Sequence, residues 1–184
     1  GMSFEQAMRV ANAAAGVVVG KLGTATADIG EVLRELDDQD ASGEGEETMA
    51  PLLSLEAMRG QVDRWRARGL KVGFTNGCFD ILHPGHVSLL AQARAACDRL
   101  VVALNTDASV RRLKGETRPV NTLEARATVM GALRMVDAVV AFDADTPLET
   151  IRALMPDVLV KGADYTAETV VGADLVLGAG GRLV

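Results

Sequence analysis

Residues 75–86 read TNGCFDILHPGH and decide the fold prediction. They follow a short apolar run at 71–75 (KVGFT) and precede a stretch whose apolar residues have helical spacing. Asn76 and Gly77 permit a tight turn with close backbone approach. Pro84 suits the first turn of a helix, because the N–H that proline lacks would have no helical partner there. The stretch therefore predicts a strand, a turn and the start of a helix.

Three further apolar runs follow at 100–104 (LVVAL), 137–142 (DAVVAF) and 157–160 (DVLV), separated by helical patterns. Short runs that are apolar on both sides are typical of parallel strands covered on both faces. The order βαβαβαβ favours an α/β fold with a Rossmann-like, doubly wound parallel sheet in three αβα layers. In such sheets ligands bind at the carboxyl ends of the strands. We therefore expect the chemistry just after Thr75, Leu104 and Val160.

The predicted helices each keep one apolar face. After Pro51 a packed domain is expected to begin, and residues 167–177, 178–181 and 182–184 suggest a helix, a turn and the start of a strand. The three clearest faces comprise Leu52, Leu55, Met58, Val62 and Trp65; Leu89, Leu90, Ala93, Ala96 and Cys97; and Leu123, Ala127, Met130 and Leu133.

The part before residue 51 has a different character. Residues 3–20 predict an alanine-rich helix that runs into a short strand, GVVVG, and residues 28–36 predict one or two further helical turns. Residues 37–48 (DDQDASGEGEET) contain six acidic residues and no aliphatic one beyond alanine, which is typical of a flexible linker. We expect an N-terminal appendage at 1–36, an acidic linker at 37–50 and a main domain at 51–184.

Composition excludes several classes of function. The 184 residues have a net charge of −6, which equals the contribution of the acidic stretch, and aromatic residues make up 3%. An acidic chain with few aromatics is unsuited to nucleic acid. The apolar stretches are far shorter than the ~20 residues of a membrane-spanning helix. Two cysteines without a CxxC pair and no secretion signal favour a reduced, cytoplasmic protein.

Both histidines of the chain, His83 and His86, lie in the turn before the predicted helix. A helix start favours an anion, and two imidazoles add donors for phosphoryl oxygens. Two other interpretations stay open: a surface corner without a ligand, and a metal site of Cys78, His83 and His86, for which a fourth ligand is not evident. Phosphate binding is the favoured interpretation, with no metal ligands assigned.

Two later segments are weaker candidates. Residues 111–119 (RRLKGETRP) carry four bases against one acid, and their glycine and proline suggest a loop that brings Lys114 and Arg118 to phosphates. Residues 160–165 (VKGADY) end the last clear strand, where Lys161, Gly162 and Asp164 are candidates for holding a base or ribose. The GAGG at 178–181 follows a predicted helix rather than a strand, so we interpret it as a turn.

The segment TNGCFDILHPGHVSLL resembles the signature of the cytidylyltransferase-like nucleotidyltransferases, whose HxGH element is 83–86 here. Within that superfamily, residues 71–184 resemble the adenylyltransferase domain of the bifunctional heptose 7-phosphate kinase/heptose 1-phosphate adenylyltransferases. The stretches LNTDASVRRLKGETRPVN, LEARATVMGALRMVDAVVAFDADTP and LMPDVLVKGADY support this. Residues 1–36 resemble the end of the ribokinase-like kinase domain of those enzymes. The sequence ends before a Ser/Thr-rich element of the family, so we expect the C-terminal end of the domain to be missing.

The resemblance implies AMP transfer from ATP, with Mg²⁺, to heptose 1-phosphate, giving ADP-heptose, a lipopolysaccharide precursor, and pyrophosphate. It implies a homodimer as the assembly. His83, His86 and Lys114 would be catalytic, and the nucleotide would be bound by Thr75, Asn76, Gly77, Phe79, Asp80, Gly85, Arg118, Arg126, Lys161, Gly162 and Asp164. Two alternatives remain: a cytidylyltransferase acting on glycerol 3-phosphate or a similar polyol phosphate, and a nucleotide-binding fragment without turnover.

Overall fold

A computed structural model describes residues 4–19, 26–32, 49–162 and 170–184. The chain divides into two units, residues 1–48 and 49–184. The first contains helix α1 (Phe4–Val19) and a helical turn at 29–32. The predicted strand at 16–20 is therefore wrong, because the helix continues through Val19. A helix satisfies its backbone groups within its own segment, whereas a strand needs a neighbouring strand. Most of the predicted acidic linker lies outside the described residues.

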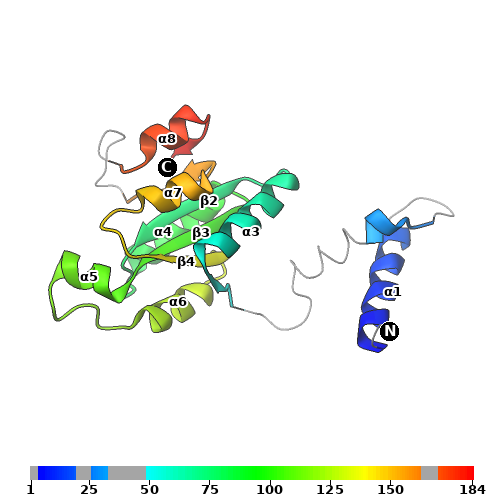
Figure 1. Ribbon diagram of the computed structural model, residues 1–184, viewed down its shortest axis with the longest axis horizontal. Helices are drawn as coiled ribbons and strands as arrows, with labels where there is room; N and C mark the ends of the chain where they lie inside the picture. Colours follow the sequence, from blue (N-terminus) through cyan, green and yellow to red (C-terminus); the bar gives the residue numbers. More distant parts are fainter. Residues whose placement is uncertain (1–3, 20–25, 33–48, 163–169) are drawn as a thin grey trace. The chain divides into compact units, whose positions relative to one another are not determined.

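The second unit is built on one sheet with the strand order β1-β4-β3-β2-β5-β6. Every neighbouring pair in it is parallel. Figure 1 shows the sheet with helices packed around it. The Rossmann-like, doubly wound α/β fold predicted from the sequence is confirmed. The strands are β1 (Leu52–Leu53), β2 (Val72–Gly77), β3 (Arg99–Asn105), β4 (Ala138–Phe142), β5 (Val158–Leu159) and β6 (Arg182–Leu183).

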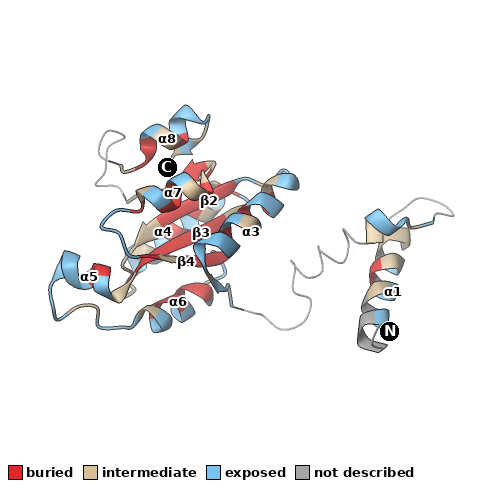
Figure 2. Ribbon diagram, viewed as in Figure 1, coloured by how far each residue is buried: buried red, intermediate tan, exposed pale blue. Residues whose placement is uncertain are grey.

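Helices cover both faces of this sheet and give it three layers. Helices α3 (Leu55–Ala67), α7 (Leu148–Leu154) and α8 (Ala173–Gly178) pack on one face. Helices α4 (Pro84–Ala95) and α6 (Leu123–Gly131) pack on the other. In Figure 2 the buried residues are concentrated in the strands and on the inner sides of the helices.

Strand β3 illustrates why its residues alternate between the two cores. Val101 and Ala103 belong to the α3 side, whereas Leu100, Val102 and Leu104 belong to the α4 side. Successive side chains of a strand point to opposite faces, so a strand buried on both faces must be apolar throughout. The run LVVAL is therefore explained by its central place in the sheet.

Several predicted element boundaries need correction. Asn76 and Gly77, predicted to form a tight turn, are the last two residues of β2. Ala96 and Cys97, predicted on a helical face, lie beyond the end of α4. Leu52 is not on the face of a helix but in edge strand β1, paired with Val139, and is 45% exposed. The helix starts later because the Ser54 side chain caps it by accepting a hydrogen bond from the N–H of Ala57. Leu133 lies beyond the end of α6, although it still packs against the core. Among the described residues, no helix has the length and apolar character needed to traverse a bilayer.

The topology brings the candidate segments together. Strands β2 and β5 are neighbours in the sheet. After β2 the chain continues to β3, on the side of β2 away from β5, and after β5 it continues to β6, on the side of β5 away from β2. The switch point of the sheet therefore lies between β2 and β5. The segments that leave the carboxyl ends of these strands begin at Cys78 and Val160, where ligands of such folds bind.

Candidate active site

The two histidines are stacked at the start of α4. His83 is the N-cap residue and Pro84 occupies the first turn, as predicted. The ring centroids of His83 and His86 are 3.8 Å apart with an interplanar angle of 27°. The side chain of His83 makes no cap hydrogen bond, so it leaves the helix start available to an anion. A Cβ at Gly85 would lie 3.0 Å from the His83 ring, so a larger residue there requires that ring to shift.

The turn that leads to the histidines is shaped around Phe79. Phe79 is buried and adopts a φ of +44°, in the left-handed region. Its ring centroid lies 5.0 Å from that of His86. A Cβ at Gly77 would lie 3.0 Å from the Phe79 ring, so the lack of a side chain there lets the ring fold back over the turn. Gly77 and Phe79 therefore contribute by supporting His86.

Electrostatics at His86 favour its neutral form. Burial, the neighbouring His83 and the ammonium group of Lys114 lower the pKa of His86 below its ordinary value of 6.5. The Nδ1 atom of His86 is buried and has no hydrogen-bond partner. A bound anion would raise the pKa of His86 again, because its negative charge counteracts the effect of burial and of the two basic neighbours. It would also provide an acceptor for a ring N–H.

Buried polar atoms without partners gather at this place. Among the described residues they are Oγ1 of Thr75, Oδ1 of Asn76, Nδ1 of His86 and Nε of Arg118. Buried polar groups in folded proteins are nearly always hydrogen-bonded, so a cluster of exceptions requires an explanation. Three of the four atoms lie at the end of β2 or the start of α4. These three atoms make this edge of the sheet the candidate place for a polar ligand.

Asp80 joins the β2–α4 turn to the segment before α6. Its buried carboxylate accepts hydrogen bonds from the backbone N–H groups of Val120 and Asn121, at 2.8 and 2.9 Å. Its Oδ2 lies 2.7 Å from Nε of Arg118, an ion pair without hydrogen-bond alignment. Burial opposes ionisation, but the Asn121 and Val120 donors and the Arg118 charge hold the pKa of Asp80 below its usual value. Arg118 thus pairs with a carboxylate through Nε.

Arg126, predicted to bind the nucleotide, has a different place in the structure. Its side chain is 1% exposed and every contact that it makes is with protein. Nε donates to the carbonyl of Asn121 at 3.0 Å, Nη1 to that of Cys78 at 2.7 Å, and Nη2 to that of Asn105 at 2.9 Å. Nη2 also donates to Oδ1 of Asp107 at 2.7 Å. These contacts give Arg126 a structural role at the site, and its predicted binding of the nucleotide stays a prediction.

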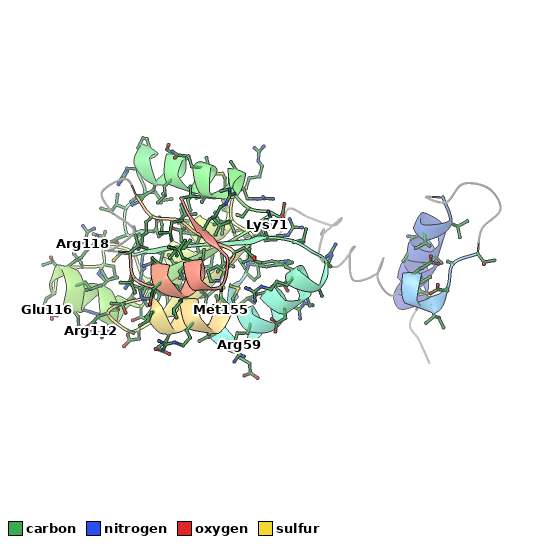
Figure 3. All side chains as sticks on the ribbon, turned by 90° about the horizontal axis from the view of Figure 1, so that it is seen from above. Arg59, Lys71, Arg112, Glu116, Arg118 and Met155 are labelled. Atoms are coloured by element: carbon green, nitrogen blue, oxygen red, sulfur yellow. The ribbon has the colours of Figure 1, made fainter. Side chains whose placement is uncertain are left out.

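The basic segment at 111–119 is part helix, not only a loop. Helix α5 (Asp107–Lys114) ends at Lys114, and Gly115, with a φ of +97°, stops it. Lys114 is exposed and close enough to His86 to influence its pKa. Figure 3 shows Arg112, Glu116 and Arg118 toward the end of the domain opposite to Lys71, the residue before β2. The bases therefore lie at the carboxyl ends of the strands.

The segment after β5 is described only in part. Lys161 and Gly162 are half-buried, and Asp164 lies outside the described residues. The backbone N–H of Lys161 donates to the carbonyl of Val184 at 3.0 Å. Burial lowers the pKa of the Lys161 ammonium group. Because β5 is the neighbour of β2, Lys161 emerges beside the Asn76 end of the site.

Two residues of the site were not among the predicted ones. Asn105 is buried, and its Nδ2 donates to Oγ of Ser109 at 3.0 Å. Asp107 accepts the hydrogen bond from Arg126 described above. Both lie within three residues of the end of the predicted strand at 100–104, at the edge where ligands are expected. Their position after a strand was therefore the signal that pointed to them.

The described residues do not form a protein-held magnesium site. They contain no group of three or more histidines, cysteines or carboxylates placed to hold a metal ion. The two carboxylates in the network, Asp80 and Asp107, are already engaged by Arg118 and Arg126. Magnesium prefers oxygen ligands and is often bound through substrate phosphates. The donor set therefore does not fit a metal bound by the protein itself.

Comparison with known proteins assigns the domain to a family. The sequence profile described as Cytidylyltransferase-like matches residues 74–178, which contain the histidines, α5 and Arg126. The chain belongs to the cytidylyltransferase-like family. Its domain is thus that of a nucleotidyltransferase, and the resemblance inferred from the HPGH motif is confirmed.

Relatives of this cytidylyltransferase-like chain extend over its whole length. It is 70% identical over 184 residues to the Bifunctional protein HldE of Gluconacetobacter diazotrophicus and 60% identical to that of Caulobacter vibrioides. The chain spans only 38% and 37% of these two proteins, respectively. The relationship therefore covers less than two-fifths of each curated relative.

Among the solved structures similar to this cytidylyltransferase-like chain are the following two. One is a lipopolysaccharide core biosynthesis protein from Thermoplasma volcanium, with a TM-score of 0.51 and 26% identity, covering 62% of this chain and 93% of that one. The other is a pantoate-beta-alanine ligase from Francisella tularensis, with a TM-score of 0.56 and 14% identity, covering 74% of this chain and 66% of that one. The second likeness supports the fold alone.

Proposed function

We propose that the 49–184 unit transfers AMP from ATP to D-glycero-β-D-manno-heptose 1-phosphate, giving ADP-heptose and pyrophosphate. The observation that carries the proposal is the stacked pair His83–His86 at a helix start, beside buried polar atoms that lack protein partners. The resemblance to heptose 1-phosphate adenylyltransferases supplies the substrates.

The reaction in this proposal is a direct displacement. A phosphate oxygen of the sugar 1-phosphate attacks the α-phosphorus of ATP, a new P–O bond forms, and the bond to pyrophosphate breaks. The protein contributes positioning and charge stabilisation, since no covalent enzyme intermediate is needed. The α4 start and the two imidazoles bind the triphosphate, and His86 donates to the oxygens on which charge develops. One such donor contributes about 2.7–4 kcal/mol.

The surrounding residues complete the proposed nucleotide site. Lys114 adds a positive charge at the end of α5. Thr75 and Asn76 offer their unpartnered oxygens to the nucleotide. Lys161 and Gly162, with Asp164, are proposed to approach the base or ribose from the neighbouring strand. Mg²⁺ is proposed to enter with the triphosphate, and no step is assigned to it.

A second candidate keeps the fold and changes the substrates. The family's own description, cytidylyltransferase-like, favours a CTP-dependent reaction with glycerol 3-phosphate or a similar polyol phosphate. The HPGH segment binds phosphates and does not by itself distinguish adenine from cytosine. The choice between the two reactions therefore depends on a measurement of substrate preference.

The test is a pyrophosphate-release assay with Mg²⁺, ATP or CTP, and heptose 1-phosphate or glycerol 3-phosphate. We expect release only with ATP and heptose 1-phosphate. Release with CTP and the polyol phosphate would replace the proposal by its alternative. Binding of ATP measured by calorimetry, with no release for any pair, would instead identify a nucleotide-binding fragment without turnover.

The N-terminal unit and the assembly are also subjects of this proposal. The relatives match all 184 residues, including the first unit, while extending well beyond this chain. On the resemblance stated in the sequence analysis, we propose that residues 1–36 belong to a kinase domain and are joined to the 49–184 unit through the acidic linker. We further propose a homodimer that acts in the cytoplasm, where ATP is available. Sedimentation at micromolar concentration tests the dimer, and a monomer would contradict it.

A further inference from the structure

We propose that Asp107 and Arg126 are positioning residues, which hold helix α5 so that Lys114 at its far end reaches the phosphates bound beside His86. The proposal rests on the proposed function and names two residues that act on the same site through Lys114. It assigns Asp107 a role and removes Arg126 from contact with the nucleotide.

Arg126 joins the segments that surround the site. Its guanidinium binds the carbonyl of Cys78 in the turn before the histidines and the carbonyl of Asn105 at the end of β3. It also binds the carbonyl of Asn121 before α6 and the carboxylate of Asp107 in the first turn of α5. One rigid, planar group thus fixes the histidine turn and the start of α5 relative to each other.

Helix α5 is anchored at its first turn by Asp107 and in its middle by the buried Ser109 and Val110 and the exposed Arg112. Of its eight residues only Ser109 and Val110 are buried, and residues 111–114 are exposed. At about 1.5 Å per residue, Lys114 lies roughly 10 Å along the axis from Asp107. A tilt of about 10° at the first turn would therefore move the Lys114 end by roughly 2 Å. Displacements of about 1 Å at a reacting group can lower rates about 10²-fold.

The Asp107–Arg126 pair is suited to this role by its environment. The Arg126 side chain is 1% exposed and that of Asp107 is 30% exposed. A buried arginine that loses its carboxylate partner keeps an uncompensated charge, so the first turn would rearrange around it. The three backbone carbonyls bound to Arg126 do not belong to α5. The carboxylate of Asp107 is therefore the group of α5 that Arg126 binds directly, while Asn105 adds an indirect link through Ser109.

A second, exposed set of contacts provides the control. Arg112 in the middle of α5 pairs with Asp143 at 3.3 Å and with Asp145 at 3.2 Å. Its side chain is 45% exposed. Exposed ion pairs contribute little, typically below about 1 kcal/mol. If only the buried link matters for Lys114, then removing Arg112 leaves catalysis almost unchanged.

The experiment is a double-mutant cycle with Asp107→Ala and Lys114→Ala. The readouts are kcat/KM for nucleotidyl transfer and the Kd for Mg-ATP. In the wild-type background we expect Asp107→Ala to lower kcat/KM by about 10–100-fold. In the Lys114→Ala background the same change should cost less than about threefold, because the group that Asp107 positions is already gone. Arg112→Gln should stay within about threefold of wild type.

A merely structural role gives a different result. If Asp107→Ala only destabilises the fold, its effects multiply with those of Lys114→Ala, and this outcome overturns the proposal. Asp107→Asn keeps an acceptor for Arg126 and should recover part of the activity, which serves as the second variant. Arg126→Lys should fall close to Arg126→Met, since lysine cannot reproduce four contacts. A fully active Arg126→Lys overturns the proposal, because charge alone would then be sufficient.

The cycle also separates this inference from the proposed function. Coupled effects on Mg-ATP binding without transfer to heptose 1-phosphate would support the positioning role and reject the proposed acceptor. Independent effects in a protein that makes ADP-heptose would reject the positioning role alone. A chain that binds no nucleotide would overturn both.

Discussion

The polar groups at the two ends of the sheet differ in whether they have hydrogen-bond partners within the protein. At the amino end, three carboxylates each accept a hydrogen bond from the first backbone N–H groups of a neighbouring strand. The pairs are Asp98 with Lys71, Asp157 with Val72, and Asp137 with Leu100, at 2.8, 2.8 and 2.7 Å. At the carboxyl end, side-chain atoms of Thr75, Asn76 and His86 are buried and have no partner.

The difference distinguishes folding from function within one sheet. Asp137 also lies 3.6 Å from both Arg94 and Arg99, so even its charge is compensated within the protein. At the carboxyl end, the buried polar atoms have lost their hydrogen bonds to water without gaining protein partners, which costs free energy. A ligand that supplies charge and hydrogen bonds can offset this cost. Variants at the two ends should therefore separate stability from activity.

The largest effect is expected for His86→Ala at the carboxyl end. Loss of this donor should lower kcat by about 10²–10³. Its Nδ1 makes no protein hydrogen bond, so the free energy of unfolding should change little. Steady-state kinetics and urea denaturation measure the two quantities. A variant with wild-type kcat would contradict the proposed role of the histidine pair.

The protonation of His86 provides a second, independent test of its role, through the pH dependence of stability and of Mg-ATP binding. Because the pKa of His86 is lowered in the folded protein, the unfolded chain binds this proton first as pH falls below 6.5. Wild type should therefore lose stability relative to His86→Ala on acidification. The negative charge of bound Mg-ATP should raise the pKa of His86. Binding of Mg-ATP near pH 6 should therefore be accompanied by proton uptake in wild type, and by less uptake in His86→Ala. Calorimetry in buffers of different ionisation enthalpy measures this uptake, and equal uptake in both proteins would argue against the assignment.

An intermediate effect is expected for Asp157→Ala at the amino end. It leaves the N–H of Val72, a buried residue, without its acceptor and should lower the free energy of unfolding by about 1–3 kcal/mol. Below the melting transition kcat/KM should stay within about twofold of wild type. Asp157→Asn, which keeps an acceptor oxygen, should retain most of the stability. Loss of activity in a folded Asp157→Ala protein would contradict the idea that the amino end of the sheet serves stability and the carboxyl end serves activity.

The smallest effect is expected for Thr75→Val. The Thr75 side chain is fully buried and its hydroxyl has no partner, so replacing it by a methyl group should raise the free energy of unfolding by about 1 kcal/mol. If the hydroxyl binds the nucleotide, Kd for Mg-ATP should rise about threefold to tenfold. Thr75→Ser is the matched control for the hydroxyl. A destabilised Thr75→Val protein would show that the hydroxyl already serves the fold.

Much of this molecule is predictable from local patterns. The strand at 100–104 is apolar throughout because both of its faces are buried, and this pattern alone indicated a central parallel strand. Pro84 marked the helix start, and the histidines beside it marked the phosphate site. These features depend on neighbours in the sequence, so the sequence makes them visible.

The remaining features depend on partners that are distant in the sequence. Nothing near Arg126 indicates that its guanidinium meets Cys78 and Asp107, which lie 48 and 19 positions away. The two-residue strand β1 forms because it pairs with β4, whereas the sequence pattern places Leu52 on the face of a helix. Conversely, residues 16–19 have strand-like composition but continue α1. Hydrophobic periodicity indicates which face of a segment is apolar. It does not indicate which distant strand or side chain that segment contacts.

The contact between position 85 and the His83 ring has a consequence for protein engineering. A side chain at 85 would meet Cε1 and Nδ1 of that imidazole at 3.0 Å, tighter than ordinary packing. In a library randomised across this motif, larger residues at 85 would survive only together with a replacement or a new rotamer at 83. The two positions would then have to be designed as a pair, and a scan of one position at a time would miss the permitted combinations.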